Sequence, residues 1–306
     1  MERPTMTDTA VADPDSGLSA AELAARYGLR VAGARPSLAA YTRQLWAYRH
    51  FIAAHANARL ITTFSKARLG QLWQVLTPLT NAAVYYLIFG VVIGTRGDIP
   101  NFIAYLCTGL FIFNFTQTAA LQGTQAITGN LGLIRALHFP RACLPISVTL
   151  TQFQQLIASM AVLVGIVLIS GEPITLSWLL VVPALLLQSL FNVGLTLALA
   201  RIGSKVPDLK QLMPFITRTW MYASGVLYSV ALFDKHLDPI HPALADLMRM
   251  NPLLVYIELV RDALVASAPS SSPAPQLWLL GIGWAILAGI GGYIYFWLGE
   301  KEYGRG

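Results

Sequence analysis

Six long hydrophobic segments alternate with polar stretches along the chain between Leu72 and Leu298. About 20 consecutive apolar residues form a helix long enough to cross the hydrocarbon core of a bilayer. The pattern therefore predicts an all-α integral membrane protein with six transmembrane helices. Their approximate limits are 72–94, 101–124, 145–170, 175–200, 211–232 and 277–298.

Ionisable side chains are nearly absent from these segments. Five of the six contain no Asp, Glu, Lys or Arg, and the fifth along the chain contains only Arg218. Ion-coupled transporters and proton relays need ionisable groups at membrane depth. If this protein transports a solute, we expect the driving energy to come from outside the helices.

The composition agrees with a polytopic membrane protein, since 55% of the 306 residues are hydrophobic and only 12% are charged. The two cysteines, Cys107 and Cys143, lie within a span and at a junction of loop and span, so we expect neither a disulfide framework nor a metal site. The net charge of +6 would suggest nucleic acid in a soluble protein. Here the basic residues mark cytoplasmic loops, and no nucleic-acid partner is expected.

The distribution of Lys and Arg predicts the orientation. With the N-terminus inside, seventeen of these residues lie on the cytoplasmic side and four lie outside. Cytoplasmic loops carry an excess of Lys and Arg, which predicts that both termini are cytoplasmic. Residues 1–37 are expected to be a partly disordered cytoplasmic tail, residues 71–300 the six-span domain, and residues 301–306 a short cytoplasmic C-terminus.

Residues 38–70, before the first span, are predicted to form an amphipathic helix along the membrane surface. Tyr41, Leu45, Tyr48 and Ile52 fall on one stripe, and basic residues lie largely off it. A helix with a basic face and an apolar, aromatic-bearing face lies in the membrane interface. It serves either as an anchor or in gating.

Residues 233–275, between the fifth and sixth spans, are too long for a plain connection. An apolar run from Leu253 to Val265 is broken by Glu258, Arg261 and Asp262. The run is too short and too charged to cross a bilayer. We expect re-entrant or interfacial helices at the outer face.

The predicted cytoplasmic loop at about 130–143 contains large apolar residues beside arginines. This combination is typical of a docking surface. The alternative is a basic loop whose apolar residues dip into the membrane interface. The residues concerned are Leu133, Ile134, Arg135, Phe139, Pro140 and Arg141.

Five short motifs occur along the sequence: Lys66-x-x-Leu69-Gly70-x-x-Trp73-x-x-Leu76-x-Pro78, Leu133-Ile134-Arg135…Phe139-Pro140-Arg141…Pro145, Val206-Pro207-Asp208-Leu209, Ser224-Gly225-Val226-Leu227-Tyr228 and Asn251-Pro252-Leu253…Arg261. With these motifs, the chain resembles ABC-2 type exporter permeases of the polysaccharide, teichoic acid and O-antigen group over about residues 40–300. The chain departs from that pattern at three places: Phe64-Ser65 where the family often has Arg-Tyr, Pro207 where it has Arg, and Gly225 where it has Pro.

The resemblance implies a transport subunit and not an enzyme. No G-x-x-x-x-G-K-[ST] motif occurs in the sequence, so the chain does not bind ATP through a P-loop and needs no cofactor of its own. A separate ABC ATPase subunit would bind ATP and Mg²⁺ and press on a coupling helix at about 130–143, with two copies of each chain. The implied cargo is a lipid-linked polysaccharide, galactan or O-antigen-like, moved from the cytoplasm across the bacterial inner membrane.

The resemblance also suggests site residues. Arg59, Lys66 and Arg68 would meet an incoming lipid diphosphate, and the competing explanation is attraction to ordinary anionic membrane lipids. Asn251, Pro252 and Arg261 would belong to an outer gate. Five aromatic residues would stack on sugars in a channel, or else belong to interfacial belts and the helix core: Tyr85, Tyr86, Phe111, Trp220 and Tyr222.

Neutral amides on the second, third and fourth spans also have two interpretations. They hydrogen-bond sugar hydroxyls without a charge, or they hold helices together in lipid. They are Gln117, Gln122, Gln125, Gln152, Gln154, Gln155, Gln188 and Asn192.

Two other functions remain open from the sequence. One is an ABC-2 permease for a small amphiphile such as a drug or lipopeptide. The other is a membrane-embedded glycosyltransferase or acyltransferase, which needs acidic or histidine side chains for acid–base or metal chemistry. Candidates cluster outside the membrane, but prolines interrupt them and their spacing fits no helical ligand pattern: Asp234, His236, Asp238, His241 and Asp246.

Overall fold

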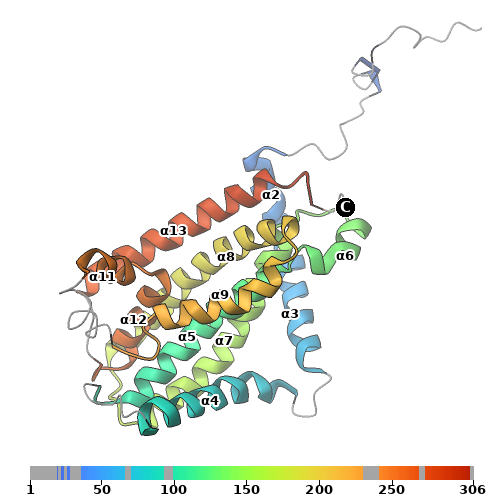
Figure 1. Ribbon diagram of the computed structural model, residues 1–306. Coiled ribbons are helices and arrows are strands. Elements are labelled where there is room, and N and C mark those ends of the chain that lie inside the picture. Colours follow the sequence, from blue (N-terminus) through green and yellow to red (C-terminus); the bar gives the residue numbers. More distant parts are fainter. Residues whose placement is uncertain are drawn as a thin grey trace, which may run out of the picture. The chain divides into compact units, whose positions relative to one another are not determined.

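The structure is a computed structural model of the chain (Figure 1). It describes Ser19, Glu22–Leu23, Arg26–Tyr27 and residues 36–65, 70–92, 99–229, 241–268 and 273–303. The chain divides into two units, Met1–Ser37 and Leu38–Gly306. The fold below is that of the second unit.

Every regular element in the described residues of this unit is a helix, which confirms the prediction of an all-α integral membrane protein. Short 3-10 turns occur at Gly70–Leu72, Thr128–Asn130 and Leu176–Leu180. The longer helices are α2 (Leu38–Ala47), α3 (Arg49–Ser65), α4 (Trp73–Tyr85) with a π-helical continuation (Tyr86–Val92), α5 (Phe102–Thr124), α6 (Leu131–Ala136), α7 (Cys143–Ile169), α8 (Val181–Lys205), α9 (Leu209–Ala223), α11 (Pro242–Arg249), α12 (Pro252–Leu264) and α13 (Ala274–Leu298).

Four described helical segments are long and apolar enough to cross a membrane. They are Phe102–Thr124, Cys143–Ile169, Leu176–Lys205 and Ala274–Leu298. Each coincides within a few residues with a predicted span, apart from the extension of α8 to Lys205. The predicted first span corresponds to α4 and its π-helical continuation, whose apolar part is shorter. The count of six spans therefore stays a prediction.

The predicted fifth span, 211–232, does not continue as one helix. Helix α9 ends at Ala223, and Gly225 follows with a φ of +61°, a left-handed conformation that suits glycine. Its 15 residues give a length of about 22 Å, short of the roughly 30 Å hydrocarbon core. Residues 230–240 lie outside the described part of the chain.

Helices α5, α7, α8 and α13 run side by side and form the main bundle (Figure 1). Helix α13 lies very close to α8 because glycines face each other. A Cβ on Gly194 would lie 1.9 Å from the Ala288 carbonyl oxygen, and one on Gly292 would lie 2.1 Å from the Gly194 oxygen. Small residues allow such close helix contacts in membranes.

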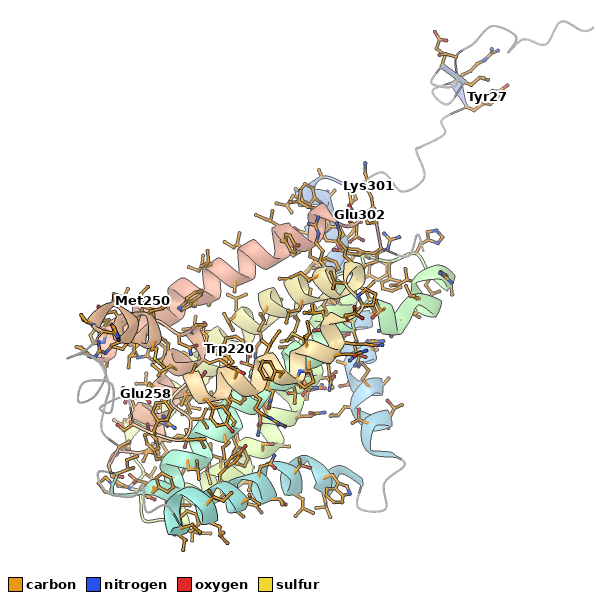
Figure 2. All side chains as sticks on the ribbon, viewed as in Figure 1. Tyr27, Trp220, Met250, Glu258, Lys301 and Glu302 are labelled. Carbon is orange, nitrogen blue, oxygen red and sulfur yellow. The ribbon has the colours of Figure 1, made fainter. Side chains whose placement is uncertain are left out.

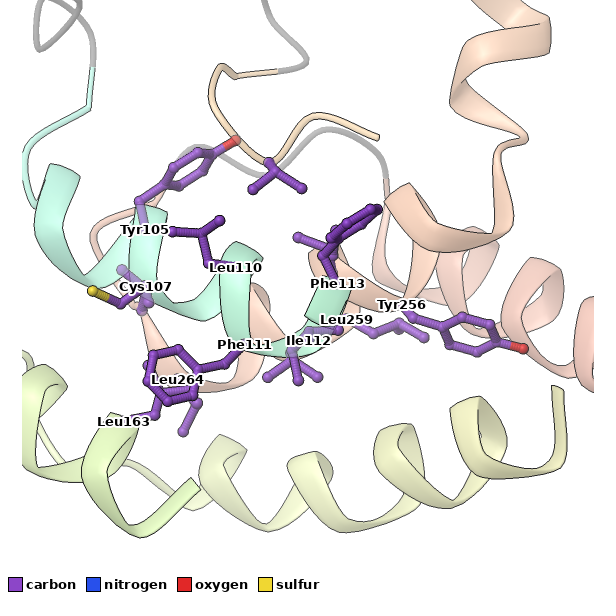
Figure 3. Packing of buried hydrophobic residues seen from close by; sticks show 14 of the residues in the cluster. Tyr105, Cys107, Leu110, Phe111, Ile112, Phe113, Leu163, Tyr256, Leu259 and Leu264 are labelled. Carbon is purple, nitrogen blue, oxygen red and sulfur yellow. The ribbon is translucent and has the colours of Figure 1, made fainter. Parts of the chain in front are cut away.

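The largest core cluster surrounds α5. Most residues between Phe102 and Phe115 are buried, and they pack against α7, α8 and α12. Figure 3 shows Phe113 of α5 near Leu259 and Tyr256 of α12, and Phe111 of α5 near Leu264 of α12 and Leu163 of α7. Helix α12, in the predicted outer gate region, is buried along nearly its whole length between α5, α8 and α13.

The two ends of the bundle contain different elements. The basic end contains α2, α3, α6 and residues 299–303. The opposite end contains Asn101, Glu172 and the C-terminal part of α12, and there the Asn101 Nδ2 donates to Glu172 Oε1 at 2.9 Å.

Candidate functional site

The predicted coupling segment forms a 3-10 turn, the short helix α6 and an irregular return to α7 at the basic end. Ile134 is 8% exposed and belongs to the core cluster of that end. Leu133 and Phe139 are partly buried against the same cluster, and the Phe139 ring centroid lies 5.0 Å from that of Phe51 on α3. These three side chains therefore pack the segment onto the bundle.

The outward surface of the segment has a different composition from the one that the sequence predicts. Arg135, Leu137 and His138 are exposed, and Leu137 presents 51% of its surface. We call these three residues the docking face, after the role predicted for this segment. Sequence reasoning missed Leu137, because a six-residue helix is too short for periodicity to show which apolar residues face outward.

Arg141 is held by Glu300, which follows α13. The Arg141 backbone N donates to Glu300 Oε1 at 3.1 Å, and its Nη1 donates to the Glu300 carbonyl at 2.9 Å. The Tyr41 hydroxyl donates to Glu300 Oε2 at 2.7 Å, and Ala142 N donates to that hydroxyl. Burial raises the pKa of Glu300, while the bonds from Tyr41 and Arg141 act in the other direction. This Glu300 cluster fixes the start of α7 against α2 and the C-terminus, with Pro140 buried beside it.

A cavity of about 310 Å³ opens at the same end, beside Arg59. Arg59 is half-buried on α3, its Nη2 donates to Gln122 Oε1 at 3.3 Å, and burial lowers the pKa of its guanidinium. Gln125, Gly129 and Asn130 complete the lining. Lys66 and Arg68, the other predicted phosphate contacts, lie outside the described residues.

Asn251 and Trp220, predicted for a gate and a channel, contact each other. The Trp220 Nε1 donates to Asn251 Oδ1 at 2.9 Å, and the same oxygen accepts from Leu253 N as the cap of α12. Asn251 Nδ2 donates to the Ala223 carbonyl at the end of α9. Pro252 occupies the first turn of α12, where its missing N–H costs nothing.

Arg261 lies at the centre of a buried polar cluster and is 1% exposed. Its Nη1 lies 2.9 Å from Glu258 Oε1, one turn earlier on α12, and also donates to Gly225 O at 2.9 Å. Its Nε donates to Tyr105 O at 3.2 Å, and its Nη2 donates to Val226 O at 3.0 Å. The guanidinium carbon also lies 3.4 Å from the centroid of the Tyr105 ring.

The Arg261 cluster and Asn251 therefore fix residues 223–226 from two sides. Gly109 of α5 makes room, because a Cβ there would lie 2.4 Å from Arg261 Nη2. Figure 2 shows Glu258 and Trp220 in this part of the molecule, with Lys301 and Glu302 far away at the basic end.

The remaining predicted channel aromatics have unlike surroundings. Phe111 is 2% exposed, whereas Tyr222 is 52% exposed. The Tyr85 hydroxyl lies 3.9 Å from Met221 Sδ, and the Tyr86 ring lies 6.4 Å from that of Phe102. Their role in a channel stays a prediction.

The acidic and histidine residues considered for metal or acid–base chemistry lie only partly within the described residues. Asp234, His236 and Asp238 lie outside the described residues, and Asp246 pairs with Arg249 at 2.9 Å. Among the side chains that the structure describes, no group of three His, Cys, Asp or Glu could hold a metal ion.

Residues 52–265 match the family model described as ABC-2 type transporter, a range that runs from α3 to the end of α12. The chain therefore belongs to the ABC-2 type transporter family. Two similar proteins are named O-antigen export system permease protein RfbA. The one from Myxococcus xanthus is 27% identical over 69% of this chain and 79% of the relative. The one from Klebsiella pneumoniae is 27% identical over 67% of this chain and 76% of the relative. The polysialic acid transport protein KpsM of Escherichia coli is also similar, with 25% identity over 67% of this chain and 77% of the relative.

Proposed function

We propose that this chain is the transmembrane permease subunit of an ATP-driven exporter. Its cargo is a lipid-linked polysaccharide that moves from the cytoplasm across the inner membrane. The observation that carries the proposal is the family match over residues 52–265. The names of the similar proteins, which refer to O-antigen export and polysialic acid transport, support a polysaccharide as cargo.

The energy would come from a separate ABC ATPase subunit that binds ATP and Mg²⁺, with two copies of each chain in the complex. The docking face offers this partner an apolar side chain beside basic ones, a composition suited to a protein contact. Movement of the segment would reach α3 through the Phe139–Phe51 contact. It would reach α7 and α2 through the Glu300 cluster.

The cavity beside Arg59 would receive the diphosphate of the cargo. Guanidinium groups hold phosphate oxygens through charge-assisted hydrogen bonds. The amides of Gln122, Gln125 and Asn130 add donors without an opposing negative charge. Lys66 and Arg68 belong to the same proposal by their position in the sequence, directly after α3. The glycan would then cross between the two copies and leave past the outer gate residues Asn251, Pro252 and Arg261.

Depletion of the protein tests this function. We expect cells that make the glycan to accumulate it on its diphosphate lipid at the cytoplasmic face, because synthesis continues without export. Extracted lipid-linked glycan is measured by mass spectrometry, and its side by enzymatic labelling of intact and opened spheroplasts. Re-expression of the wild-type chain is the control. Unchanged surface glycan together with an unchanged lipid-linked pool would contradict the proposal.

A further inference from the structure

A second cavity, of about 360 Å³, lies between α4, α5 and α7. On α5 it extends from Phe111 to Thr118, and on α7 from Gln152 to Ser159. Both stretches lie near the middle of helices that are long and apolar enough to span a membrane. The cavity is therefore at the depth of the hydrocarbon core.

The lining of this cavity is unusually polar for that depth, and none of the described residues that form it is charged. Polar side chains within membrane proteins face the bundle interior or a water-filled space. Three hydroxyl side chains, Leu156 and the rings of Trp73, Phe111 and Phe115 also line the cavity. The five amide side chains are Asn81, Asn114, Gln117, Gln152 and Gln155.

Some amides predicted for the sugar path instead hold helices together. Gln188 Nε2 donates to the Ile112 carbonyl at 2.9 Å and to Thr116 Oγ1 at 3.0 Å. Gln154 Nε2 donates to Asn57 Oδ1 of α3 at 2.6 Å, and Gln154 is not part of the cavity wall. Gln117 combines both interpretations, because it lines the cavity and its Nε2 also donates to Thr217 Oγ1 of α9 at 3.4 Å.

Gln152 differs from Gln188 and Gln154 because its side-chain Nε2 donates no hydrogen bond to a described residue. The residue is 3% exposed and lines the cavity, and its Nε2 has no hydrogen-bond partner within the described part of the chain. A buried donor without a partner costs about 1–3 kcal/mol. Such a group is retained at little cost if a ligand or water in the cavity accepts its hydrogen bond.

The side chains that line the cavity indicate which class of ligand it would bind. Amides both donate and accept hydrogen bonds, which matches the hydroxyl groups of a sugar. Aromatic rings offer flat apolar surfaces for the C–H face of a sugar ring. Phosphate would need cationic donors, and an acyl chain would leave the amides unpaired. The volume lies within the range of pockets for small ligands, about 300–1,000 Å³.

We propose that this cavity, present in each copy of the permease, binds uncharged sugar rings of the glycan as the glycan crosses between the copies. The inference rests on the proposed function and adds a location and a preference for neutral sugars over charged groups. The diphosphate end would be held elsewhere, at the Arg59 cavity of the basic end.

Site-specific photocrosslinking tests this proposal in cells that make the glycan. p-Benzoylphenylalanine replaces Phe115, which is 3% exposed in the wall, or Ile157, which is 54% exposed on α7 and outside the wall. After illumination, we expect a radiolabelled, glycosidase-sensitive adduct at position 115 at least tenfold above that at 157. Equal adducts at both positions, or adducts to phospholipid alone at 115, would overturn the proposal.

A pair of substitutions provides an independent measurement. Gln152→Leu removes the free donor, and the same change at Gln276, which is exposed at the start of α13 and outside the wall, is the control. We expect Gln152→Leu to slow export about fivefold, the effect of one hydrogen bond of roughly 1 kcal/mol, while Gln276→Leu stays within twofold of wild type. Equal rates for the two variants would contradict the proposal.

These outcomes separate the inference from the proposed function. If depletion leads to accumulation of lipid-linked glycan but position 115 forms no glycan adduct, only the sugar cavity is wrong. If depletion leaves the lipid-linked pool and the surface glycan unchanged, the function itself is wrong.

Discussion

Replacing Leu137 with aspartate should disconnect the permease from its ATPase while leaving it folded in the membrane. Leu137 is 51% exposed beside Arg135 on the docking face, so its loss opens no core cavity. A carboxylate would have to be desolvated when the partner binds. Interface residues of this kind cost about 2 kcal/mol or more, so binding of the ATPase should weaken at least about thirtyfold. Export should fall in parallel.

The measurement is binding of the purified ATPase to permease in nanodiscs, together with ATP hydrolysis by the complex. Leu247→Asp is the matched control, since Leu247 is 66% exposed on α11, away from the docking face, and should leave ATPase binding unchanged. Ile134→Ala should act differently, by lowering thermal stability, because Ile134 is buried. Normal ATPase binding by Leu137→Asp would show that the docking face is elsewhere.

Arg261→Met should strongly destabilise the folded permease. It leaves the Glu258 carboxylate buried at 1% exposure without its partner, and it removes the donors to Tyr105, Gly225 and Val226. Breaking one side of a buried ion pair typically costs about 3–5 kcal/mol. We expect a large fall in the thermal unfolding midpoint and in folded yield, measured by tryptophan fluorescence in nanodiscs.

The double variant Glu258→Gln/Arg261→Met separates the effect of the unpaired buried charge from the effect of the lost hydrogen bonds. It still lacks the bonds to the three carbonyl oxygens, but it no longer contains an unpaired buried carboxylate. Its stability should therefore lie between those of wild type and Arg261→Met. A double variant as unstable as Arg261→Met, or a wild-type midpoint for Arg261→Met, would contradict this account of the Arg261 cluster.

Apolar length was enough to predict α5, α7, α8 and α13, because a continuous apolar run has few alternatives to a spanning helix. It did not predict that α9 ends at Ala223, because the average hydrophobicity of a segment does not reveal a turn within it. Ser224-Gly225 interrupts an otherwise suitable run, and the Ser224 hydroxyl donates to Trp220 O at 2.6 Å where the helix ends.

The sequence did not predict contacts between residues that lie far apart along the chain. Tyr41 and Glu300 are 259 residues apart, and neither belongs to a motif that signals their hydrogen bond. Glu258 and Arg261 indicated that their segment does not cross the bilayer, but the sequence did not show that they form a buried pair on one helix face. As a pair, with carbonyl partners, they fit into the core beside α5.

Reconstitution tests most directly whether the driving energy comes from a separate ATPase. Proteoliposomes would contain this chain alone or with its ABC ATPase, and transport of a fluorescent lipid-linked oligosaccharide would be followed. We expect ATP-dependent transport only when both subunits are present, and none from a proton or sodium gradient. Uphill transport by this chain alone, driven by either gradient, would contradict the account.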